Sequence, residues 1–480
     1  MKILVLNCGS SSVKFQLIEM DTEEVLAKGV VEKIGSSEAI LTYKPKGKNN
    51  IVQTREILTH DVAISLVLNT LLHPKNGVIK DRSEIEGIGH RIVHGGEEFS
   101  GSVLITDVVK DSVRRCIQFA PLHNPHNLKG IEVCEELLPG IPQVGVFDTA
   151  FHQTLPAEAY IYALPMAFYR KHKIRRYGFH GTSHAYVSRK AAEYLGRPIE
   201  ELKIITCHLG NGASVAAIEG GKSIETSMGF TPLEGLVMGT RCGDIDPALV
   251  PYIVDLENLS MAQVDALLNK SSGMLGLTET TNDLREIELE AEKGSEQHKL
   301  ALDVFCHRIK KYIGAYWAIL GGLDALVFTA GIGEHSSRVR RLATSNLEDL
   351  GIAIDEEKNE KNEFDIGTGR VKVLVIPTNE ELAIARDTRD ILSSLQQEVE
   401  EPISEEKLTK ELSQISGDDK AELIAIWIRN PLINLFELAK KFEENTGKKI
   451  SIQVLKKELE ILGLSKVSEK KKAELAQAMK

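Results

Sequence analysis

The chain opens with two apolar stretches joined by a loop of glycine and serine. Residues 3–6 are apolar, and beyond the loop Val13, Phe15 and Leu17 alternate with Lys14 and Gln16. Alternation at period two predicts a strand, so the unit is strand–loop–strand. A P-loop needs Gly-Lys-Ser/Thr at the end of the loop and a helix after it, and this segment has neither. The pattern predicts a β-hairpin and argues against a P-loop.

A second segment repeats this pattern about 200 residues later. Residues 203–221, KIITCHLGNGASVAAIEGG, place an apolar run before a Gly-Asn-Gly loop and an alternating stretch after it, which turns at Gly220-Gly221. Two such hairpins suggest a duplicated domain with a nucleotide held between the halves. Gly-rich hairpins are also common without any ligand, so one of them alone would carry little weight.

Elsewhere, segments with the period of a helix alternate with short apolar runs, which predicts an α/β fold. A third Gly-rich segment, LDALVFTAGIGEHS (323–336), predicts a strand, a turn that presents backbone N–H groups to an anion or an adenosine group, and a helix from 336 to 346. The other predicted helices are 61–73, 107–119, 125–137, 181–195, 246–255, 260–270, 284–293, 296–320 and 381–396. The other predicted strands include 86–92, 143–147, 160–163 and 371–376.

Size and charge limit the class of protein. A chain of 480 residues is expected to form two or three domains. The formal net charge of -11 argues against nucleic acid as the main partner. The six cysteines are scattered without a C-x-x-C pair, which indicates reduced thiols and a cytoplasmic location. The most apolar long stretch, 315–333, is interrupted by Asp324 and predicts a buried helix and strand, not a membrane span.

Two arginines are flanked by glycines at the predicted ends of elements. Arg91 lies in GIGHRIVHGG (87–96) and Arg241 in MGTRCGDIDP (238–247). A guanidinium group suits sites that grip carboxylate or phosphoryl oxygens, because it donates paired hydrogen bonds. The alternative for any single arginine is a surface ion pair.

Other polar residues lie where a strand or loop meets a helix. Asp148 ends an apolar strand, so it either faces a cleft or caps a turn. His180 and His184 are four positions apart in GFHGTSH, but the glycine and the hydroxyl residues indicate a helix entry with Ser183 near the N-cap, and zinc is not expected. LHNPHN (122–127) is likewise interpreted as a helix entry. Asn7 and Glu380 could supply the one or two oxygens that Mg²⁺ takes from a protein beside phosphates.

Taken together and in order, NCGSSSVKF, GFHGTSHAYV, HLGNGAS, MGTRCGDIDP, TAGIGE and PTNEE resemble the motifs of the acetate kinase family. The resemblance covers residues 1 to about 397. It implies the duplicated two-lobe α/β fold of actin, Hsp70 and the sugar kinases (a ribonuclease H-like fold). It also implies reversible transfer of a phosphoryl group from ATP to acetate with Mg²⁺, or Mn²⁺ in its place, in a homodimer.

The resemblance also implies roles for individual residues. Asn7 and Glu380 would handle the metal, Arg91 would hold the carboxylate of the acid, and Val93, Leu122, Phe179 and Pro232 would line its pocket. His180 and Arg241 would stabilise the transferred phosphoryl group. The residues implied to contact ATP are Ser10, Ser12, Lys14, His208, Leu209, Gly210, Asn211, Gly212, Asp283, Leu284, Arg285, Gly331, Ile332, Gly333, Glu334 and His335.

Two of these positions need separate comment. The family treats Asp148 as catalytic, but acetate is already ionised at neutral pH and needs no general base. We therefore expect Asp148 to orient a metal-bound water or an arginine. The family usually has Asn after GIGE where this chain has His335, so we expect an altered nucleotide affinity.

Two other functions stay open at this point. A propionate- or butyrate-type acid kinase would differ in the pocket wall, and an extra methylene is worth only about 1–3 kcal/mol there. Val93 is bulky enough to favour acetate. An actin-like ATPase switch belongs to a different class, and its turnover would not depend on an acid.

The expected domains are an N-terminal lobe of residues 1–150 completed by helix 382–397, a nucleotide-binding lobe of 151–381, and an appended all-α module of 402–480. Pro402 marks a linker and Ser404 a helix start, and apolar residues at helical spacing on either side of Gly447 predict four or five helices. Because its charges are nearly balanced, a protein-interaction or oligomer-stabilising role is favoured over nucleic-acid binding. The lysine run 470–472 is interpreted as a solvated helix face.

Overall fold

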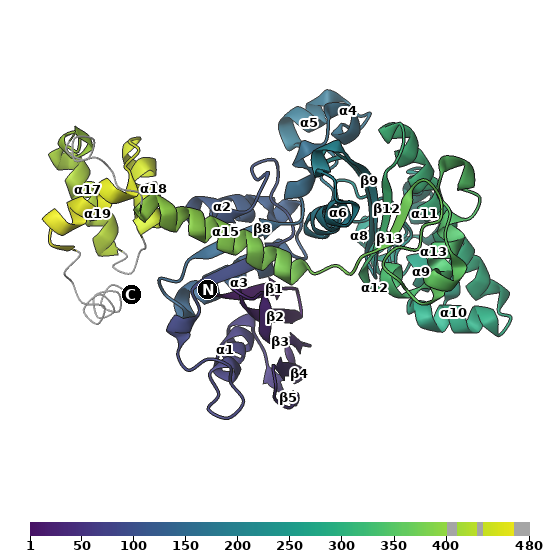
Figure 1. The fold of residues 1–480 in the computed structure, drawn as a ribbon, viewed down its shortest axis with the longest axis horizontal. Helices are drawn as coiled ribbons and strands as arrows, with labels where there is room; N and C mark the ends of the chain where they lie inside the picture. Colours follow the sequence, from purple (N-terminus) through teal and green to yellow (C-terminus); the bar gives the residue numbers. More distant parts are fainter. Residues whose placement is uncertain (401–409, 430–434, 465–480) are drawn as a thin grey trace.

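The structure is a computed structural model that describes residues 1–400, 410–429 and 435–464. Figure 1 shows two α/β lobes side by side and a small helical module at the far end of the first lobe. The two-lobe α/β fold implied by the resemblance is confirmed. The linker at Pro402, the helix start at Ser404 and the lysine run 470–472 lie outside the described residues.

The first lobe is built on an eight-stranded sheet with the order β5-β4-β3-β2-β1-β6-β8-β7. Strand β1 pairs antiparallel with β2 and parallel with β6, which in turn pairs parallel with β8. The strands are β1 (Lys2–Cys8), β2 (Ser12–Glu19), β3 (Glu24–Glu32), β4 (Ser36–Pro45), β5 (Ile51–Ile57), β6 (Gly87–Ile92), β7 (Val103–Leu104) and β8 (Gln143–Phe147). The helices of this part of the chain are α1 (His60–Leu71), α2 (Asp107–Arg115) and α3 (Asn124–Leu137), with 3-10 turns at Arg82–Glu84 and Cys116–Gln118.

The second lobe repeats the central part of that topology. Its sheet has the order β11-β10-β9-β12-β13, with β9 antiparallel to β10 and parallel to β12, which is parallel to β13. Strands β3-β2-β1-β6-β8 have the same order and polarity, so the duplication predicted from the two hairpins is confirmed. The strands are β9 (Lys203–Leu209), β10 (Ala213–Glu219), β11 (Lys222–Thr226), β12 (Ala325–Thr329) and β13 (Lys372–Val375).

Helices surround the second sheet. They are α4 (Ala157–Tyr160), α5 (Met166–His172), α6 (Gly181–Leu195), α7 (Leu249–Glu257), α8 (Met261–Lys270), α9 (Gly273–Thr278), α10 (Leu284–Glu292), α11 (Glu296–Leu320), α12 (Ala330–His335), α13 (Ser337–Thr344) and α14 (Glu356–Glu360), with 3-10 turns at Ala150–Thr154, Ile199–Glu201 and Glu348–Leu350. Helix α6 packs on one face of β9 through Val187, Ala191 and Ile204, and α11 covers the opposite face. Both faces of this sheet are therefore buried.

Most predicted elements are present, and a few are wrong. The predicted strand 160–163 is absent. Tyr160 is the last residue of helix α4, and the rest of this segment, which is bounded by Pro156 and Pro165, pairs with no strand among the described residues. Strands β3, β4 and β5 were not among the predicted strands. Helix α7 begins at Leu249 instead of 246, because Asp246 accepts a hydrogen bond from the Ala248 N–H and holds a turn.

A long helix, α15 (Glu380–Glu400), joins the lobes to the module (Figure 1). It packs against β1, β6 and β8 through Ile384, Ala385 and Leu392. The module contains α17 (Gly417–Arg429), α18 (Leu435–Thr446) and α19 (Ile452–Ile461), and residues 410–413 are also helical. Its core includes Leu423, Trp427, Leu438, Phe442, Leu455 and Leu459. Helix α19 contacts α15, and the Lys441 ammonium lies 2.6 Å from the Asp107 carboxylate of α2.

Candidate active site

The first hairpin presents polar side chains that have no protein partner. Cross-strand pairing places Asn7 opposite Lys14, and the Gly9 N–H closes the loop by donating to the Ser12 carbonyl at 2.8 Å. Because side chains alternate along β1, Asn7 shares a face with Ile3 and Val5, which α15 covers. Within the described residues, no protein group forms a hydrogen bond with the side chain of Asn7, Ser10, Ser12 or Lys14. These groups are therefore free to bind a ligand.

Arg91 and Asp148 form a paired contact at the ends of two neighbouring parallel strands. The Arg91 Nε and Nη2 atoms donate to the two carboxylate oxygens of Asp148 at 2.9 and 2.6 Å, and the Asp148 side chain is 2% exposed. The Glu380 carboxylate, on the first residue of α15, lies 4.0 Å from Arg91 Nε. Burial disfavours the charge of Arg91, but Asp148 and Glu380 outweigh it and raise the pKa of Arg91. Asp148 therefore fixes the orientation of Arg91, as expected of an orienting residue.

The pKa of Glu380 is raised, whereas an ion pair usually lowers the pKa of a carboxyl group. Burial raises the pKa of Glu380, and the nearby Asp148 charge adds to that effect, whereas Arg91 and Lys14 oppose it. A carboxylate whose loss of water contacts outweighs the effect of the neighbouring cations is a suitable ligand for a further cation.

A glycine brings the second lobe against Asp148. The Gly181 N–H donates to the Asp148 backbone carbonyl at 2.9 Å, and a Cβ on Gly181 would lie 2.4 Å from that oxygen. His180 precedes it with a φ of 57° and starts helix α6. Ser183 lies in the first turn of α6, near the N-cap as predicted. The N-cap itself is His180, and the Ser183 hydroxyl contacts the side chains of His208 and Thr378.

Three histidines gather beside the second hairpin. His180 stacks on His208 with ring centroids 4.2 Å apart. The Ser214 hydroxyl lies 2.9 Å from His180 Nδ1 and 2.7 Å from His184 Nε2. Burial is the main cause that lowers the pKa of His180 and of His184 well below the ordinary histidine value, and it lowers the pKa of His208 to about 4. All three rings are therefore neutral at pH 7.

Arg241 differs from Arg91 because no carboxylate of the described residues forms an ion pair with it. Its Nη1 atom donates to the Pro232 carbonyl at 3.0 Å, and burial lowers the pKa of Arg241. A Cβ on Gly212 would lie 3.4 Å from His180 Nε2 and 3.5 Å from Arg241 Nη1, so both groups point toward the same glycine of the second hairpin. This guanidinium is suited to bind an anion.

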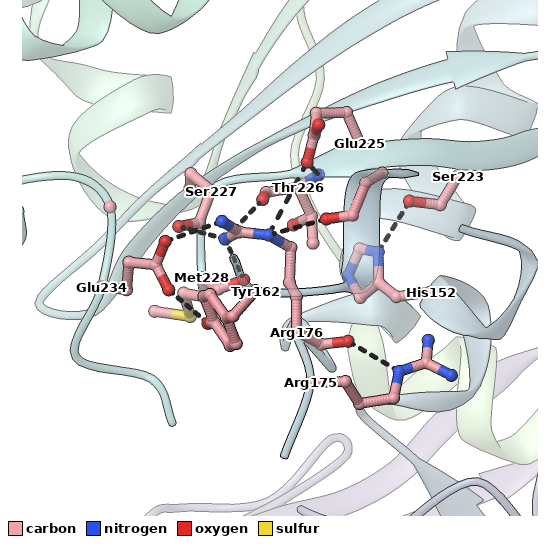
Figure 2. A network of polar contacts seen from close by, with 12 residues as sticks. His152, Tyr162, Arg175, Arg176, Ser223, Glu225, Thr226, Ser227, Met228 and Glu234 are labelled. Carbon is pink, nitrogen blue, oxygen red and sulfur yellow. Dashed lines mark hydrogen bonds and ion pairs between the residues drawn. The ribbon is translucent and has the colours of Figure 1, made fainter. Parts of the chain in front are cut away.

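The irregular segment 227–248 carries both Pro232 and Arg241, and a buried polar network holds it (Figure 2). Arg176 donates to the backbone carbonyls of Thr226, Ser227 and Met228 and, at 2.7 Å, to the Glu234 carboxylate. The Tyr162 hydroxyl donates to the other oxygen of Glu234. Further along, Asp244 accepts from the Gly235 N–H and the Tyr312 hydroxyl, each at 2.8 Å. These contacts keep Arg241 in place without regular secondary structure.

The residues implied to line the acid pocket differ in exposure. Val93 and Phe179 are buried in one hydrophobic cluster, Pro232 is half-buried, and Leu122 is 57% exposed. Leu122 is therefore the member of this set that lies at the surface.

A hollow of about 480 Å³ lies between the second hairpin, α10 and α12. Eight residues implied to bind ATP line it: Gly210, Asn211, Asp283, Leu284, Arg285, Gly331, Ile332 and His335. Asn282, Glu288 and Ser336 also line it and were not predicted. His208, Leu209, Gly212, Gly333 and Glu334 are not among its lining residues, and Glu334 Oε1 instead accepts from the Thr378 N–H at 3.1 Å. The volume suits a ligand of nucleoside size.

Comparison with known proteins decides the family. The acetokinase family model matches residues 2–386. The chain belongs to the acetokinase family. Members of this family use ATP as a substrate. The acetate kinase of Desulfitobacterium hafniense (strain DSM 10664 / DCB-2) is 57% identical over 396 residues, which is 82% of this chain and 99% of that protein.

Two solved structures extend the comparison. The crystal structure of Porphyromonas gingivalis acetate kinase is similar with a TM-score of 0.79 and 49% identity, over 82% of this chain and 99% of that one. A propionate kinase from Francisella tularensis subsp. tularensis SCHU S4 has a TM-score of 0.77 and 44% identity, over 81% of this chain and 99% of that one. The family match ends before the appended module. Within the described residues, no helix combines the length and the apolar character that a membrane span requires.

Several residues around the site were assigned no role from the sequence. Glu234 and Arg176 lie outside the motifs, and Ser214 ends the HLGNGAS motif without a role of its own. The roles of all three depend on contacts with residues 30 or more positions away. His184 was noticed as a partner of His180 at helical spacing, but its ring nitrogens contact Thr206 and Ser214 and hold no metal-like arrangement with His180.

Proposed function

We propose that the protein transfers the terminal phosphoryl group of ATP to acetate, giving acetyl phosphate and ADP, and that it also catalyses the reverse reaction. The observation that carries this proposal is the pair of unlike arginines, Arg91 and Arg241, whose charges both act on His180. Arg91 is held by Asp148 and keeps Nη1 for the carboxylate of a small acid, whereas Arg241 is an unneutralised cation suited to the phosphoryl group. An ATPase switch would have no need of the first of these sites.

The nucleotide would occupy the hollow between α10 and α12, with its phosphates directed toward the two hairpins. Lys14, Ser10 and Ser12 would bind phosphate oxygens from the first hairpin, and the backbone of Gly210–Gly212 would do so from the second. His335 lines the hollow and is exposed, so its effect would fall on nucleotide affinity.

Asn7 and Glu380 fit a divalent cation that serves the phosphates. Asn7 has an amide oxygen that accepts no hydrogen bond from the described residues, and Glu380 is a half-buried carboxylate with a raised pKa on which the Asp148 carboxylate also acts. Mg²⁺ usually takes one or two protein oxygens together with water and phosphate. When bound, Mg²⁺ would neutralise charge on the phosphate oxygens; Mn²⁺ has a similar preference for oxygen ligands.

The chemical step requires positioning and charge stabilisation. A carboxylate oxygen of acetate forms a bond to the terminal phosphorus while the bond from that phosphorus to the bridging oxygen of ADP breaks. Arg91 orients the acid, and Arg241 and the neutral His180 donate hydrogen bonds to the phosphoryl oxygens, where negative charge spreads in the transition state. Asp148 acts by orienting Arg91, and no proton leaves the acid.

A direct assay tests the proposal. We would measure ADP release from Mg-ATP by the full chain with acetate, propionate, butyrate or no acid. Turnover that depends on acetate is expected. Equal turnover without any acid would overturn the kinase proposal and leave the ATPase switch.

Propionate is a second candidate acceptor. The similar propionate kinase structure and the exposure of Leu122 support it, since an open wall can admit one more methylene. Val93 is buried against Phe179 and favours acetate. Because one methylene is worth about 1–3 kcal/mol, the ratio of kcat/KM for acetate to that for propionate is expected to be about tenfold or more. A ratio below one would assign propionate as the substrate.

We also propose that the protein is a cytoplasmic homodimer, with lobes at 1–150 (with helix 382–397) and 151–381, and that the module of 402–480 contacts a protein partner or stabilises the oligomer. Three exposed apolar side chains on α7 and α8 support a dimer: Tyr252, Leu256 and Met261. Light scattering on the full chain and on a chain ending at residue 397 would give the oligomeric state of each. A dimer only in the full chain would assign the stabilising role to the module.

A further inference from the structure

A row of alternating hydroxyl and imidazole groups runs inward from His180. Ser214 Oγ on β10 lies between His180 Nδ1, at 2.9 Å, and His184 Nε2, at 2.7 Å. The other ring nitrogen, His184 Nδ1, lies 2.7 Å from Thr206 Oγ1 on β9. Thr206, His184 and Ser214 are all fully buried. Two elements of the sheet and helix α6 therefore supply one continuous series of contacts.

The number of protons limits how these contacts can be made. A neutral imidazole has one N–H donor and one acceptor nitrogen, and a hydroxyl has one proton to donate. The depressed pKa values of His180 and His184 keep both rings neutral. Only two orders then satisfy every contact: donation from Thr206 outward to His180, or donation from His180 inward to Thr206.

The inner end of the row favours the outward order. His184 is the only side chain among the described residues that contacts the Thr206 hydroxyl. In the inward order this hydroxyl accepts from His184, and its own proton is buried without an acceptor. In the outward order Thr206 donates to His184 Nδ1, so every fully buried donor of the row is used, and the N–H left over is that of His180 Nε2 at the part-buried outer end. A buried donor without an acceptor is costly, so the outward order is more stable.

The outer end favours the same order. His180 Nε2 and Arg241 Nη1 both lie close to the Cβ direction of Gly212, where an anion held by Arg241 would sit. In the outward order Ser214 donates to His180 Nδ1, which leaves the ring proton on Nε2. In the inward order Nε2 carries a lone pair that would face the anion and repel it.

We propose that Thr206, His184 and Ser214 are positioning residues that hold His180 as its Nε2–H tautomer, so that this ring donates a hydrogen bond to the transferred phosphoryl group. The inference rests on the proposed function for the identity of that group. It adds three residues with no contact to substrate and a defined proton order: Thr206 to His184 to Ser214 to His180. The stacked ring of His208 has its own hydroxyl partner, Ser183, at 2.8 Å and is separate from this row.

Replacement of the innermost hydroxyl tests the order at a distance from the site. Thr206→Val has nearly the same shape and removes the first donor, so His180 can adopt either tautomer. We expect kcat to fall about tenfold while KM for acetate and ATP stays within about twofold, because one phosphoryl donor is weakened. Thr206→Ser restores the hydroxyl and should restore kcat. Ser188→Ala removes a buried hydroxyl of α6 that donates only to the Ala185 carbonyl, and it should leave kcat unchanged.

A double-mutant cycle separates this role from a general loss of structure. In a His180→Ala background, Thr206→Val should cause no further loss of kcat, because no ring remains to be oriented. A full additional loss in that background would overturn the proposal.

The tautomer can be measured without any turnover. With ¹⁵N-labelled histidine in the full chain, the ring nitrogen shifts of His180 report which nitrogen carries the proton. We expect Nε2–H in the native sequence, both with no ligand and with MgADP, aluminium fluoride and acetate, and a mixture in Thr206→Val. An Nδ1–H ring in the native sequence would overturn the inference. Because this readout does not use the reaction, it stays valid if acetate-dependent turnover is absent and the proposed function fails.

Discussion

The two Gly-rich hairpins have the same topology but opposite surroundings. On the first, Asn7 and Lys14 are cross-strand neighbours whose side chains form no hydrogen bond within the described residues, and Lys14 is exposed. On the second, the equivalent pair is His208 and Ser214, which are buried and contact Ser183, His180 and His184. Each loop is closed by the same kind of contact, from Gly9 to Ser12 in one and from Gly210 to Gly212 in the other.

The difference indicates how a duplicated fold divides its work. A hairpin with free polar groups forms its polar contacts only when the nucleotide and cation bind. Substitutions in it should therefore change ligand affinity and leave the stability of the fold unchanged. A hairpin whose polar groups are already bonded to one another has its geometry fixed before binding. Its substitutions should therefore change both stability and the rate of the chemical step. Four predictions follow from this contrast, ordered by expected free-energy effect.

The largest effect is expected from acid, because buried neutral rings gather at the second hairpin. Burial lowers the pKa of His152 and His208 to about 4, and that of His180 and His184 well below the ordinary value; in the first lobe the pKa of His90 falls to about 4 and that of His94 to about 3. The unfolded chain takes up protons at these rings below about pH 6.5, and the folded chain does not. Above that pH these rings do not lower the free energy of unfolding. As the pH falls from there toward 4, the free energy of unfolding decreases.

Below about pH 6.5 the free energy of unfolding falls with pH, and each ring contributes about 1.4 kcal/mol per pH unit to that fall. The six rings together contribute roughly 8 kcal/mol per pH unit. The free energy of unfolding from denaturant titrations at about pH 8, 7, 6 and 5.5 measures it. The change in unfolding free energy between the two highest pH values is the internal control and should be small. Equal stability at the two extremes would show that these rings are not buried and neutral.

The next effect is expected at Arg241, which faces the second hairpin without a carboxylate partner. Arg241→Ala removes a donor aimed at the phosphoryl oxygens, so kcat should fall about 10²–10³-fold, or about 2.7–4 kcal/mol in transition-state stabilisation. The unfolding free energy should change little, since the Pro232 carbonyl and the Met238 sulfur are the described groups that lose a donor. Arg55→Ala, an exposed position on β5, is the control. A variant that retained native kcat would remove Arg241 from the reaction.

A matched pair of substitutions tests the contrast directly. Lys14→Ala on the first hairpin should raise KM for ATP about tenfold at unchanged stability, because a charge-assisted contact is lost only in the complex. Ser214→Ala on the second should lower the unfolding free energy by about 1–3 kcal/mol, because two buried ring nitrogens lose their partner. Lys28→Ala on the exposed surface of β3 is the control for Lys14. The contrast would be wrong if the Lys14 variant were the less stable of the two.

The smallest effect is expected from the appended module. Among its described residues, the main contacts with the first lobe are those of α19 with α15 and the ion pair between Lys441 and Asp107 of α2. Such an ion pair is worth about 0–1 kcal/mol. A chain ending at residue 397 should therefore keep kcat within about twofold. Any change should be in the dependence of the rate on Mg²⁺ or ATP concentration, since α15 begins at Glu380, the proposed metal ligand. A change confined to the acetate KM would contradict this assignment.

The sequence alone predicted much of what forms locally. Alternation beside Gly9 and Gly210 identified both hairpins, and helical periodicity with Pro125 identified α3, because these signals depend on neighbours along the chain. The order of the motifs, read together, indicated the family. It also placed Arg91, Asp148 and Glu380 at the ends of elements, where the structure has them.

Only the tertiary structure decided what these residues touch. Whether Arg91 was paired, whether Ser183 capped α6 and whether 160–163 formed a strand all depended on partners from other segments: Asp148, His208, and a strand neighbour that is absent. The clearest case is Ser214, which ends the HLGNGAS motif but was given no role of its own by the sequence. Its position between two rings of α6 exists because β10 and α6 pack together, and such packing is a property of the whole fold.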